Sequence, residues 1–217
     1  MPSAKIIVGL VGGGVALAAA VFVAGVYMIN NVEQPKYGVL IADGDIEIRD
    51  YPALVVAEVE TSGDRKSAVN SGFRPLAAYI FAKERTGGSI AMTAPVTQER
   101  ETIAMTAPVV QSRANGQQDR DTWHVRFFMP SQHALDALPQ PAGGDIRLKS
   151  MPATRRAAIR FSGVATDALI SEKEARLHDW LARRGSKSSG SATYAYYNAP
   201  FTPGPMRRNE VWLELRE

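Results

Sequence analysis

The 217-residue chain contains an internal repeat, and this repeat limits the folds that the chain can adopt. Residues 46–53 read IEIRDYPA, and residues 146–153 read IRLKSMPA. The apolar residues at the first, third and sixth places recur, and the Pro-Ala ending is identical. A run rich in β-branched residues follows each copy and ends on Ser-Gly, at residues 62–63 and 162–163. The period is too long for a solenoid unit.

The similarity continues beyond these strands. A helix-like segment comes next in each half, and then an X-X-Ala-Pro-X run, MTAPV at residues 92–96 and YNAPF at residues 197–201. Both halves close on an aromatic strand, at residues 123–129 and 211–215. These matches occur in the same order, so they predict a duplicated β-β-α-β-β unit. Two such units would build one α+β domain around a pseudo-twofold axis.

The composition supports one globular domain with a short appendage. Hydrophobic residues make up 45% of the chain and charged residues 22%, which gives ample material for a core. The net charge is only +3, and acidic and basic residues are interleaved, so nucleic-acid binding has little support. Without cysteine the chain has no disulfides, no thiolate metal sites and no cysteine nucleophile.

An uncharged apolar run occupies residues 6–29. At ~1.5 Å rise per residue it is long enough to cross a hydrocarbon core of about 30 Å. It predicts an N-terminal transmembrane anchor at residues 1–30, a linker at 31–36 and a domain at 37–217. Lys5 precedes the run, which favours a single-pass membrane protein with an extracytoplasmic, periplasmic domain. The alternative is a cleaved signal peptide, because the alanines within the run resemble a cleavage site.

Strands and a helix are expected early in the domain. Residues 37–41 and 46–51 have the pattern of a hairpin around an Asp-Gly turn, and residues 53–61 continue as a strand. In residues 64–82 the apolar residues recur with helical spacing. Pro75 lies within this segment and predicts a kink or a late start.

The second helix is expected at residues 166–184. Ser171 and Glu174 have capping-box spacing, acidic residues come early and basic residues late, and Gly185 ends the pattern.

The heptapeptide IAMTAPV occurs twice, at residues 90–96 and again at 103–109. The polar residues 97–102 between the copies predict a hairpin of two matching strands. A proline in each copy places both near a sheet edge or a bulge.

The sequence lacks the usual catalytic motifs, since it has no G-x-S-x-G, no H-E-x-x-H and no Walker loop. His124, His133 and His178 are far apart in sequence and are interpreted as surface residues, so no metal site is predicted. Carboxylates such as Glu58 and Glu99 are interpreted as solvated strand edges rather than an acid/base pair. We therefore do not expect an enzyme.

Soft apolar and aromatic residues gather near the ends of the expected strands. Most of them should belong to the core, but a curved, duplicated sheet can also leave a cleft for a small ligand. They are Met92, Met105, Met129, Tyr194, Tyr196, Tyr197 and Phe201.

Several motifs resemble those of the SOUL haem-binding protein family, in order from about Pro35 to the C-terminus. They are Glu47-Ile48-Arg49-x-Tyr51, Gly72-Phe73, Met92-Thr93-x-Pro95-Val96, Tyr197-Asn198-x-Pro200-Phe201 and Arg208-Asn209-Glu210-Val211-Trp212. The resemblance implies a twisted eight-stranded antiparallel β-barrel with two flanking helices and internal pseudo-symmetry. The same fold is similar to that of gyrase-inhibitor-like effector-binding domains.

The resemblance also implies non-covalent binding of haem or another tetrapyrrole. Some family members have an axial histidine where this chain has Asp50, a poor iron ligand, so histidine ligation does not carry over. In other members the porphyrin lies against the first helix and the loop before the last strand. The corresponding positions here are Asn70, Phe73, Arg74, Ala77, Phe201 and Thr202.

Two functional hypotheses follow. The first is a membrane-anchored, non-catalytic tetrapyrrole-binding protein, in which Met92, Met105 or a tyrosine would be the candidate iron ligand. The second is an effector-binding or structural module of the same fold that recognises another apolar ligand or a protein partner.

Overall fold

The structure is a computed structural model that describes residues 32–83, 86–100 and 122–216. These residues form one nine-stranded antiparallel sheet with two α-helices. In chain order the elements are β1 (Gly38–Asp43), β2 (Ile46–Tyr51), β3 (Leu54–Ser62), α2 (Arg65–Ile80), β4 (Val96–Arg100), β5 (Thr122–Phe128), the 3-10 turn η1 (Leu135–Ala137), β6 (Ile146–Met151), β7 (Thr154–Phe161), α3 (Asp167–Arg183), β8 (Ser188–Tyr196), the 3-10 turn η2 (Gly204–Met206) and β9 (Asn209–Leu215).

The order of strands across the sheet shows the internal symmetry. The order is β1-β2-β7-β9-β8-β4-β5-β3-β6. The counterparts in the two repeats are β2 and β6, β3 and β7, β4 and β8, and β5 and β9. Without β1, the strands at equal distances from the two ends of this order are such counterparts. The pseudo-twofold axis therefore passes between β4 and β8, where Val96 pairs with Tyr196.

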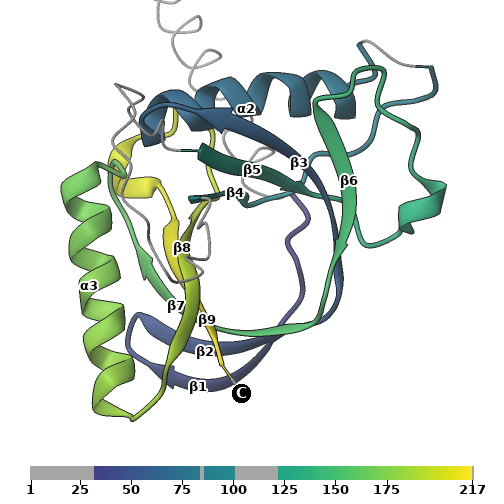
Figure 1. The fold of residues 1–217 in the computed structure, drawn as a ribbon. Helices are drawn as coiled ribbons and strands as arrows, with labels where there is room; N and C mark the ends of the chain where they lie inside the picture. The colour runs from purple at the N-terminus through teal and green to yellow at the C-terminus, as the bar shows by residue number, and fades with distance from the viewer. Residues whose placement is uncertain (1–31, 84–85, 101–121, 217) are drawn as a thin grey trace, which may run out of the picture.

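The two repeats exchange strands. Only Pro52 and Ala53 separate β2 from β3, yet β2 pairs with β7 and β3 pairs with β6. A tight hairpin between β2 and β3 is excluded because the chain passes directly from one end of the sheet to the other (Figure 1). Each repeat thus completes the sheet of the other.

Both helices lie on the outer side of the curved sheet (Figure 1). α2 packs against β3 and β5, and α3 packs against β7, β8 and β9. One hydrophobic cluster fills the space beneath each helix. A third cluster lies on the inner side of the sheet and includes Val56, Phe128 and Trp212.

The sheet differs from the expected eight-stranded barrel in two respects. It has nine strands, because the predicted hairpin at residues 37–51 adds β1 to the eight strands of the repeats. It is also open, with β1 at one edge and β6 at the other. Every residue of β1 is exposed, so this strand extends the sheet edge and does not close a barrel.

The expected hairpin of two IAMTAPV strands is wrong for its described part. Residues 97–100, predicted as a turn, belong to β4, which pairs with β5 and β8. Residues 90–95 precede this strand, and Thr93 makes only an isolated bridge to Glu33. Residues 97–100 form a strand despite their polar composition, because they pair with a neighbouring strand on each side. The second copy, at residues 103–109, lies outside the described residues.

The two Ala-Pro runs are not equivalent parts of the repeat, contrary to the sequence interpretation. Ala94-Pro95 comes before β4, whereas Ala199-Pro200 comes after β8. Because β4 and β8 are antiparallel neighbours, both runs nevertheless lie at the same end of the central strand pair. Ala94 and Tyr197 share the inner hydrophobic cluster there.

Both helices lie close to their predicted positions. The Asp64 side chain accepts a hydrogen bond from the Ser67 backbone N–H at 2.9 Å and caps α2, which includes Pro75. The predicted Ser171 capping box is wrong, because Thr166 caps α3 about one turn earlier. Gly185 follows α3 with φ +67°, a conformation that favours glycine and ends the helix as predicted.

The predicted anchor at residues 1–30, with its apolar run at 6–29, lies outside the described residues. Among the described helices, none is long and apolar enough to cross a membrane.

Gly72 allows α2 to approach the sheet closely. A Cβ atom at this position would lie 2.6 Å from Cβ and 2.7 Å from Cγ2 of Val125 on β5. Val125 is fully buried, so neither side can move aside easily.

We expect Gly72→Ala to lower the free energy of unfolding by about 1–3 kcal/mol, because it overpacks the contact between α2 and β5. Urea denaturation followed by tryptophan fluorescence measures this change. Gly143→Ala is the matched control, since a Cβ there meets nothing within 4 Å. Equal stability of the two variants would contradict the close contact.

Candidate functional site

α2 carries four of the residues that the family resemblance implied as ligand contacts. Asn70, Arg74 and Ala77 recur with helical spacing, so they lie along one side of the helix. Asn70 and Arg74 are exposed, and Ala77 is half-buried. Within the described part of the chain Arg74 forms no ion pair, so its guanidinium can receive a carboxylate. We call these three residues the α2 strip.

Phe73 is turned towards the sheet. Its ring centroid lies 5.2 Å from that of Phe127 on β5, and the two rings meet edge to face. It also packs against the hydrophobic cluster beneath α2, as Met92 does. Phe73 therefore stabilises the position of α2, a role that needs no ligand.

Phe201 and Thr202 lie in the connection between β8 and β9, residues 197–208, and face different ways. The Phe201 side chain is 59% exposed, whereas Thr202 is only 2% exposed. Arg207 donates hydrogen bonds to the carbonyl oxygens of Pro200 and Thr202, which holds this part of the chain in place. The Phe201 side chain is thus exposed to solvent, while hydrogen bonds from Arg207 hold the backbone on either side of it.

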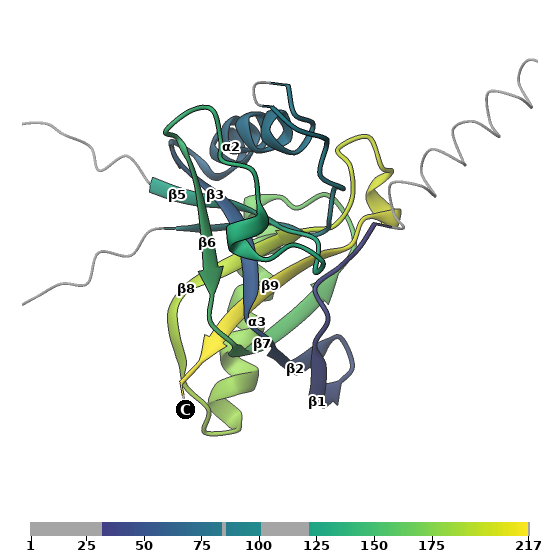
Figure 2. The same cartoon turned by 90° about the vertical axis from the view of Figure 1, so that its right-hand side faces the viewer.

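Arg65 joins the start of α2 to the second repeat. It donates hydrogen bonds of 2.6 Å to the Tyr196 hydroxyl, 2.6 Å to Asp167 Oδ1 and 2.8 Å to the Ala165 carbonyl. Tyr196 ends β8 directly before the connection that carries Phe201. In both views α2 and this connection lie at the same end of the molecule (Figures 1 and 2). The structure thus brings the α2 strip and Phe201 to one end of the fold.

Asp50, which occupies the place of an axial histidine in some relatives, is engaged in an ion pair. Arg155 donates hydrogen bonds of 2.7 and 2.9 Å to its two carboxylate oxygens. These bonds hold the pKa of the Asp50 carboxyl below its usual value. Both oxygens already have partners, so the structure gives no support to an iron ligand here.

The three histidines lie in different places. His178 is exposed on α3, as predicted, and His133 lies in a loop beside Gln132. His124 is half-buried on the inner side of the sheet, with Nδ1 3.6 Å from a Glu58 carboxylate oxygen. Among the described residues, no three histidines or carboxylates lie close enough to hold a metal ion.

Glu58 is not a solvated strand-edge residue, contrary to the sequence interpretation. It is 3% exposed and accepts hydrogen bonds from Arg126 and from Lys149. Burial alone would raise the pKa of the Glu58 carboxyl, but these two cations lower it below the usual value. Arg126 also binds Glu99, so the inner side of β3, β4 and β5 carries an ion-pair network.

A second buried network surrounds Glu210 of the Arg208-Asn209-Glu210-Val211-Trp212 motif. Glu210 is 1% exposed. Its carboxylate accepts hydrogen bonds from Arg49 at 2.7 Å, Arg208 at 2.7 Å, the Tyr197 hydroxyl at 2.8 Å and Trp212 Nε1 at 2.7 Å. Residues of three separate sequence motifs therefore meet at one buried carboxylate.

The surroundings of Glu210 determine its charge. Burial alone would raise the pKa of the Glu210 carboxyl, but the hydrogen bond and charge of Arg49, with Arg208, keep it below the usual value. Burial also raises the pKa of the Tyr197 hydroxyl, which stays protonated and donates to the carboxylate. The network thus holds a negative charge between two arginines.

We expect Glu210→Gln to destabilise the protein by roughly 3–5 kcal/mol, because it removes the buried anion that binds Arg49 and Arg208 and leaves Arg49 with Glu47 as its one remaining carboxylate among the described residues. A lowered folded-state pKa gives stability that is present above the pKa of an unfolded glutamate, about 4.3, and is lost as pH falls through the folded value. The variant should therefore lose less stability on acidification than the wild type.

Chemical denaturation at neutral pH and at several acidic pH values measures both effects. Glu214→Gln is the control, because Glu214 lies four residues further along the same strand and is exposed. A Glu210→Gln protein as stable as this control would contradict the role of the network.

Two shallow hollows lie away from α2. One has a volume of about 480 Å³ and lies between the η1 turn and β6, with Leu135 and Leu148 among its lining residues. The other, of about 500 Å³, is lined by three arginines, Arg160, Arg207 and Arg208. The arginine pair was visible in the sequence, but Arg160 joins it only through the pairing of β7 with β9.

The fold is shared with several solved structures. The C-terminal domain of EcmrR superposes with a TM-score of 0.56 at 12% identity, covering 83% of this chain and 98% of that one. A protein described as a hydrolase from Listeria innocua gives a TM-score of 0.52 at 14% identity, covering 82% and 94%. At such identities the likeness defines the architecture, an α+β fold of one curved sheet with two helices, and nothing about activity.

Sequence comparison identifies the family. The SOUL heme-binding protein family matches residues 32–214. Heme-binding protein 2 of Homo sapiens is 30% identical over 172 residues, 78% of each chain, and the Mus musculus protein of the same name matches equally well. The chain belongs to the SOUL heme-binding protein family.

Proposed function

We propose that this chain is a membrane-anchored protein that binds haem or a related tetrapyrrole without catalysing a reaction. Family membership is the observation that carries the proposal. The proposed contact surface consists of the α2 strip (Asn70, Arg74 and Ala77) and Phe201. Phe73 and Thr202 complete the proposed site.

The proposed surface fits the ligand in part. A tetrapyrrole has large apolar faces and carboxylate groups at one edge. Phe201 offers an exposed aromatic face and Ala77 a small side chain, while Arg74 offers a guanidinium that forms no ion pair within the described residues. Phe73 packs inwards and Thr202 is buried, so these two residues would support the surface from beneath.

The iron ligand is the weaker part of the fit. Asp50 is paired with Arg155, and the three histidines lie apart from the α2 strip. Of the candidate ligands, Met92 is half-buried against the cluster under α2, Met105 lies outside the described residues, and a tyrosine is the remaining candidate. Affinity would then come mainly from burial of the apolar faces, which predicts weak binding and similar affinities for hemin and iron-free protoporphyrin.

Titration of the full-length protein with hemin tests the proposal. We expect a shift of the Soret band that saturates at micromolar concentrations. Arg74→Glu should weaken binding by about tenfold, because it removes a charge-assisted contact. Phe201→Ser should weaken it by roughly tenfold, because it removes exposed apolar surface.

Matched controls come from the same protein. Arg147 has a side chain that is 69% exposed at the sheet edge, and Phe81 is 51% exposed beyond α2. Arg147→Glu and Phe81→Ser should bind hemin as the wild type does. If the wild type shows no Soret shift up to high micromolar hemin, the proposed function is wrong. If the controls weaken binding as much as the site variants, the proposed surface is wrong.

Membrane anchoring rests on the apolar run at residues 6–29. The full-length protein should stay in the membrane fraction after a high-pH wash, since an inserted helix is not removed by loss of electrostatic contacts. The domain would face the extracytoplasmic side. Protease added to cells with a permeabilised outer membrane and an intact inner membrane should therefore cleave the domain. Release of the full-length chain by the wash would exclude an inserted anchor.

A second candidate function is an effector-binding or structural module that recognises another apolar ligand or a protein partner. The ion pair of Asp50 with Arg155 favours it, because it removes the position at which some relatives hold iron. A thermal-shift screen separates the two functions. Stabilisation by a ligand other than a porphyrin, with none by hemin, would favour this second function.

A further inference from the structure

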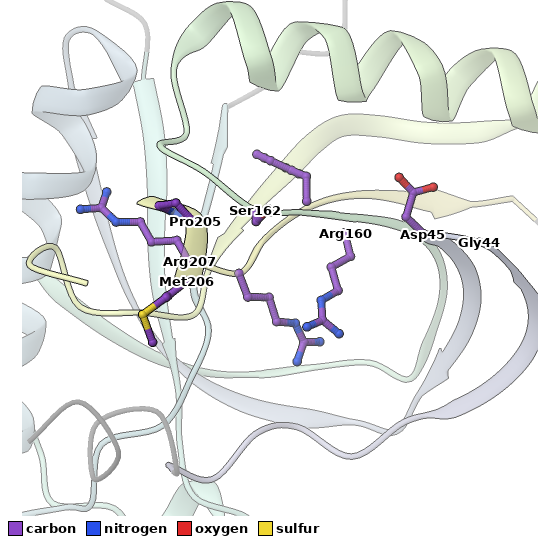
Figure 3. A pocket seen from close by; sticks show the side chains of 9 residues that line it. Gly44, Asp45, Arg160, Ser162, Pro205, Met206 and Arg207 are labelled. Atoms are coloured by element: carbon purple, nitrogen blue, oxygen red, sulfur yellow. The ribbon is translucent and has the colours of Figure 1, made fainter. Parts of the chain in front are cut away.

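The hollow lined by three arginines is formed by segments from both ends of the domain. It lies between the turn that joins β1 to β2, the end of β7 and the η2 turn before β9 (Figure 3). Its volume is about 500 Å³. None of its lining residues belongs to α2 or to the strip proposed above for the tetrapyrrole.

The charges around this hollow are unbalanced. Arg160 is exposed and forms no ion pair within the described residues. The one carboxylate in the lining, Asp45, is bound by both terminal nitrogens of Arg176 at 2.7 Å. Figure 3 shows Asp45 and Arg160 extending in opposite directions from the chain. Asp45 therefore does not neutralise Arg160.

The other two arginines add to the positive charge. Arg207 donates its hydrogen bonds to neutral carbonyl groups, so its charge has no carboxylate partner among the described residues. Arg208 is paired with Glu210, so the unpaired positive charge at the hollow comes from Arg160 and Arg207. The hollow thus has an excess of guanidinium groups, which attract carboxylate and phosphate oxygens.

The support of the hollow is ordered before any ligand arrives. The Arg208 backbone N–H donates to Asn198 Oδ1 at 2.6 Å, and the Gly163 N–H donates to the Gly204 carbonyl at 3.0 Å. Asn209 Nδ2 donates to the Gly163 carbonyl at 3.0 Å. These bonds tie the end of β7 to the η2 turn, so little ordering is needed on binding.

Exposed apolar side chains lie in the lining of the hollow and beside it. Met206 is 60% exposed and lines the hollow, and Val164, 56% exposed, lies against the η2 turn at Gly204. Exposed apolar side chains beside a group of arginines suit a ligand that has an acidic head and an apolar body.

We propose that this hollow is a second binding site, which takes the acidic head of a small amphipathic organic anion and places the apolar body of that anion on Met206 and Val164. Arg160 is the principal contact for the head. The site does not require tetrapyrrole binding at α2, so either proposal can fail without the other.

Naphthoate, an aromatic carboxylate, is a suitable probe, and naphthylmethanol is its neutral counterpart. Calorimetric titration of the full-length protein should show binding of naphthoate and at least about tenfold weaker binding of the alcohol. Arg160→Gln should weaken naphthoate binding by about tenfold or more, because it removes the charged donor. Met206→Gln should weaken it by roughly fivefold, because it removes apolar contact.

Arg147→Gln is the matched control, since it removes one exposed positive charge at the far edge of the sheet. It should bind naphthoate as the wild type does. The proposal is overturned if the wild type does not bind naphthoate, if the alcohol binds equally well, or if Arg160→Gln binds as tightly as the control.

Hemin titration of Arg160→Gln tests whether the two sites are separate, and we expect this variant to bind hemin as the wild type does. A loss of hemin binding in this variant would overturn the separation of the two sites.

Discussion

The exchange of strands between the two repeats is the constraint on which the structure depends. Each Pro-Ala connection joins two strands that do not pair with one another, so β2 finds its partner in β7 and β3 in β6. Proline cannot donate the backbone hydrogen bond that a continued ladder needs. β2 and β6 therefore pair with strands of the other repeat, and the duplicated sequence folds as a single sheet.

Buried charge reinforces this arrangement on the inner side of the sheet. Glu210 of the second repeat is held by Arg49 of the first, and Glu58 on β3 is held by Lys149 on β6. A buried carboxylate without its cation is costly, so these pairs favour the exchanged strand order over alternatives. The same pairs fill the inner side with polar contacts. Ligand binding is therefore proposed on the outer surface, at α2 and at the arginine-lined hollow.

The sequence predicted most of the local structure, and the family resemblance supplied the residues proposed as the site. The repeat at residues 46–63 and 146–163, the two helices and the β1–β2 hairpin were found from periodicity and turn residues. The residues of the α2 strip were implied by the family resemblance, and the structure adds that they lie along one side of α2. Residues 97–100 of β4 were wrongly predicted as a turn from their polar composition, because their pairing with β5 and β8 cannot be read along the chain. The cap of α3 was misplaced by one turn because Ser171 and Glu174 also have capping-box spacing.

The sequence by itself determined that the chain is a duplicated α+β domain of the SOUL heme-binding protein family, because periodicity and motif order are local properties that can be read along the chain. Only the tertiary structure decided that the sheet is open and nine-stranded, and that Glu58 and Glu210 are buried among arginines. It also decided that Arg160 lies beside Arg207 and Arg208. These features depend on which strands pair across the pseudo-twofold axis, and residues far apart in sequence become neighbours only through that pairing.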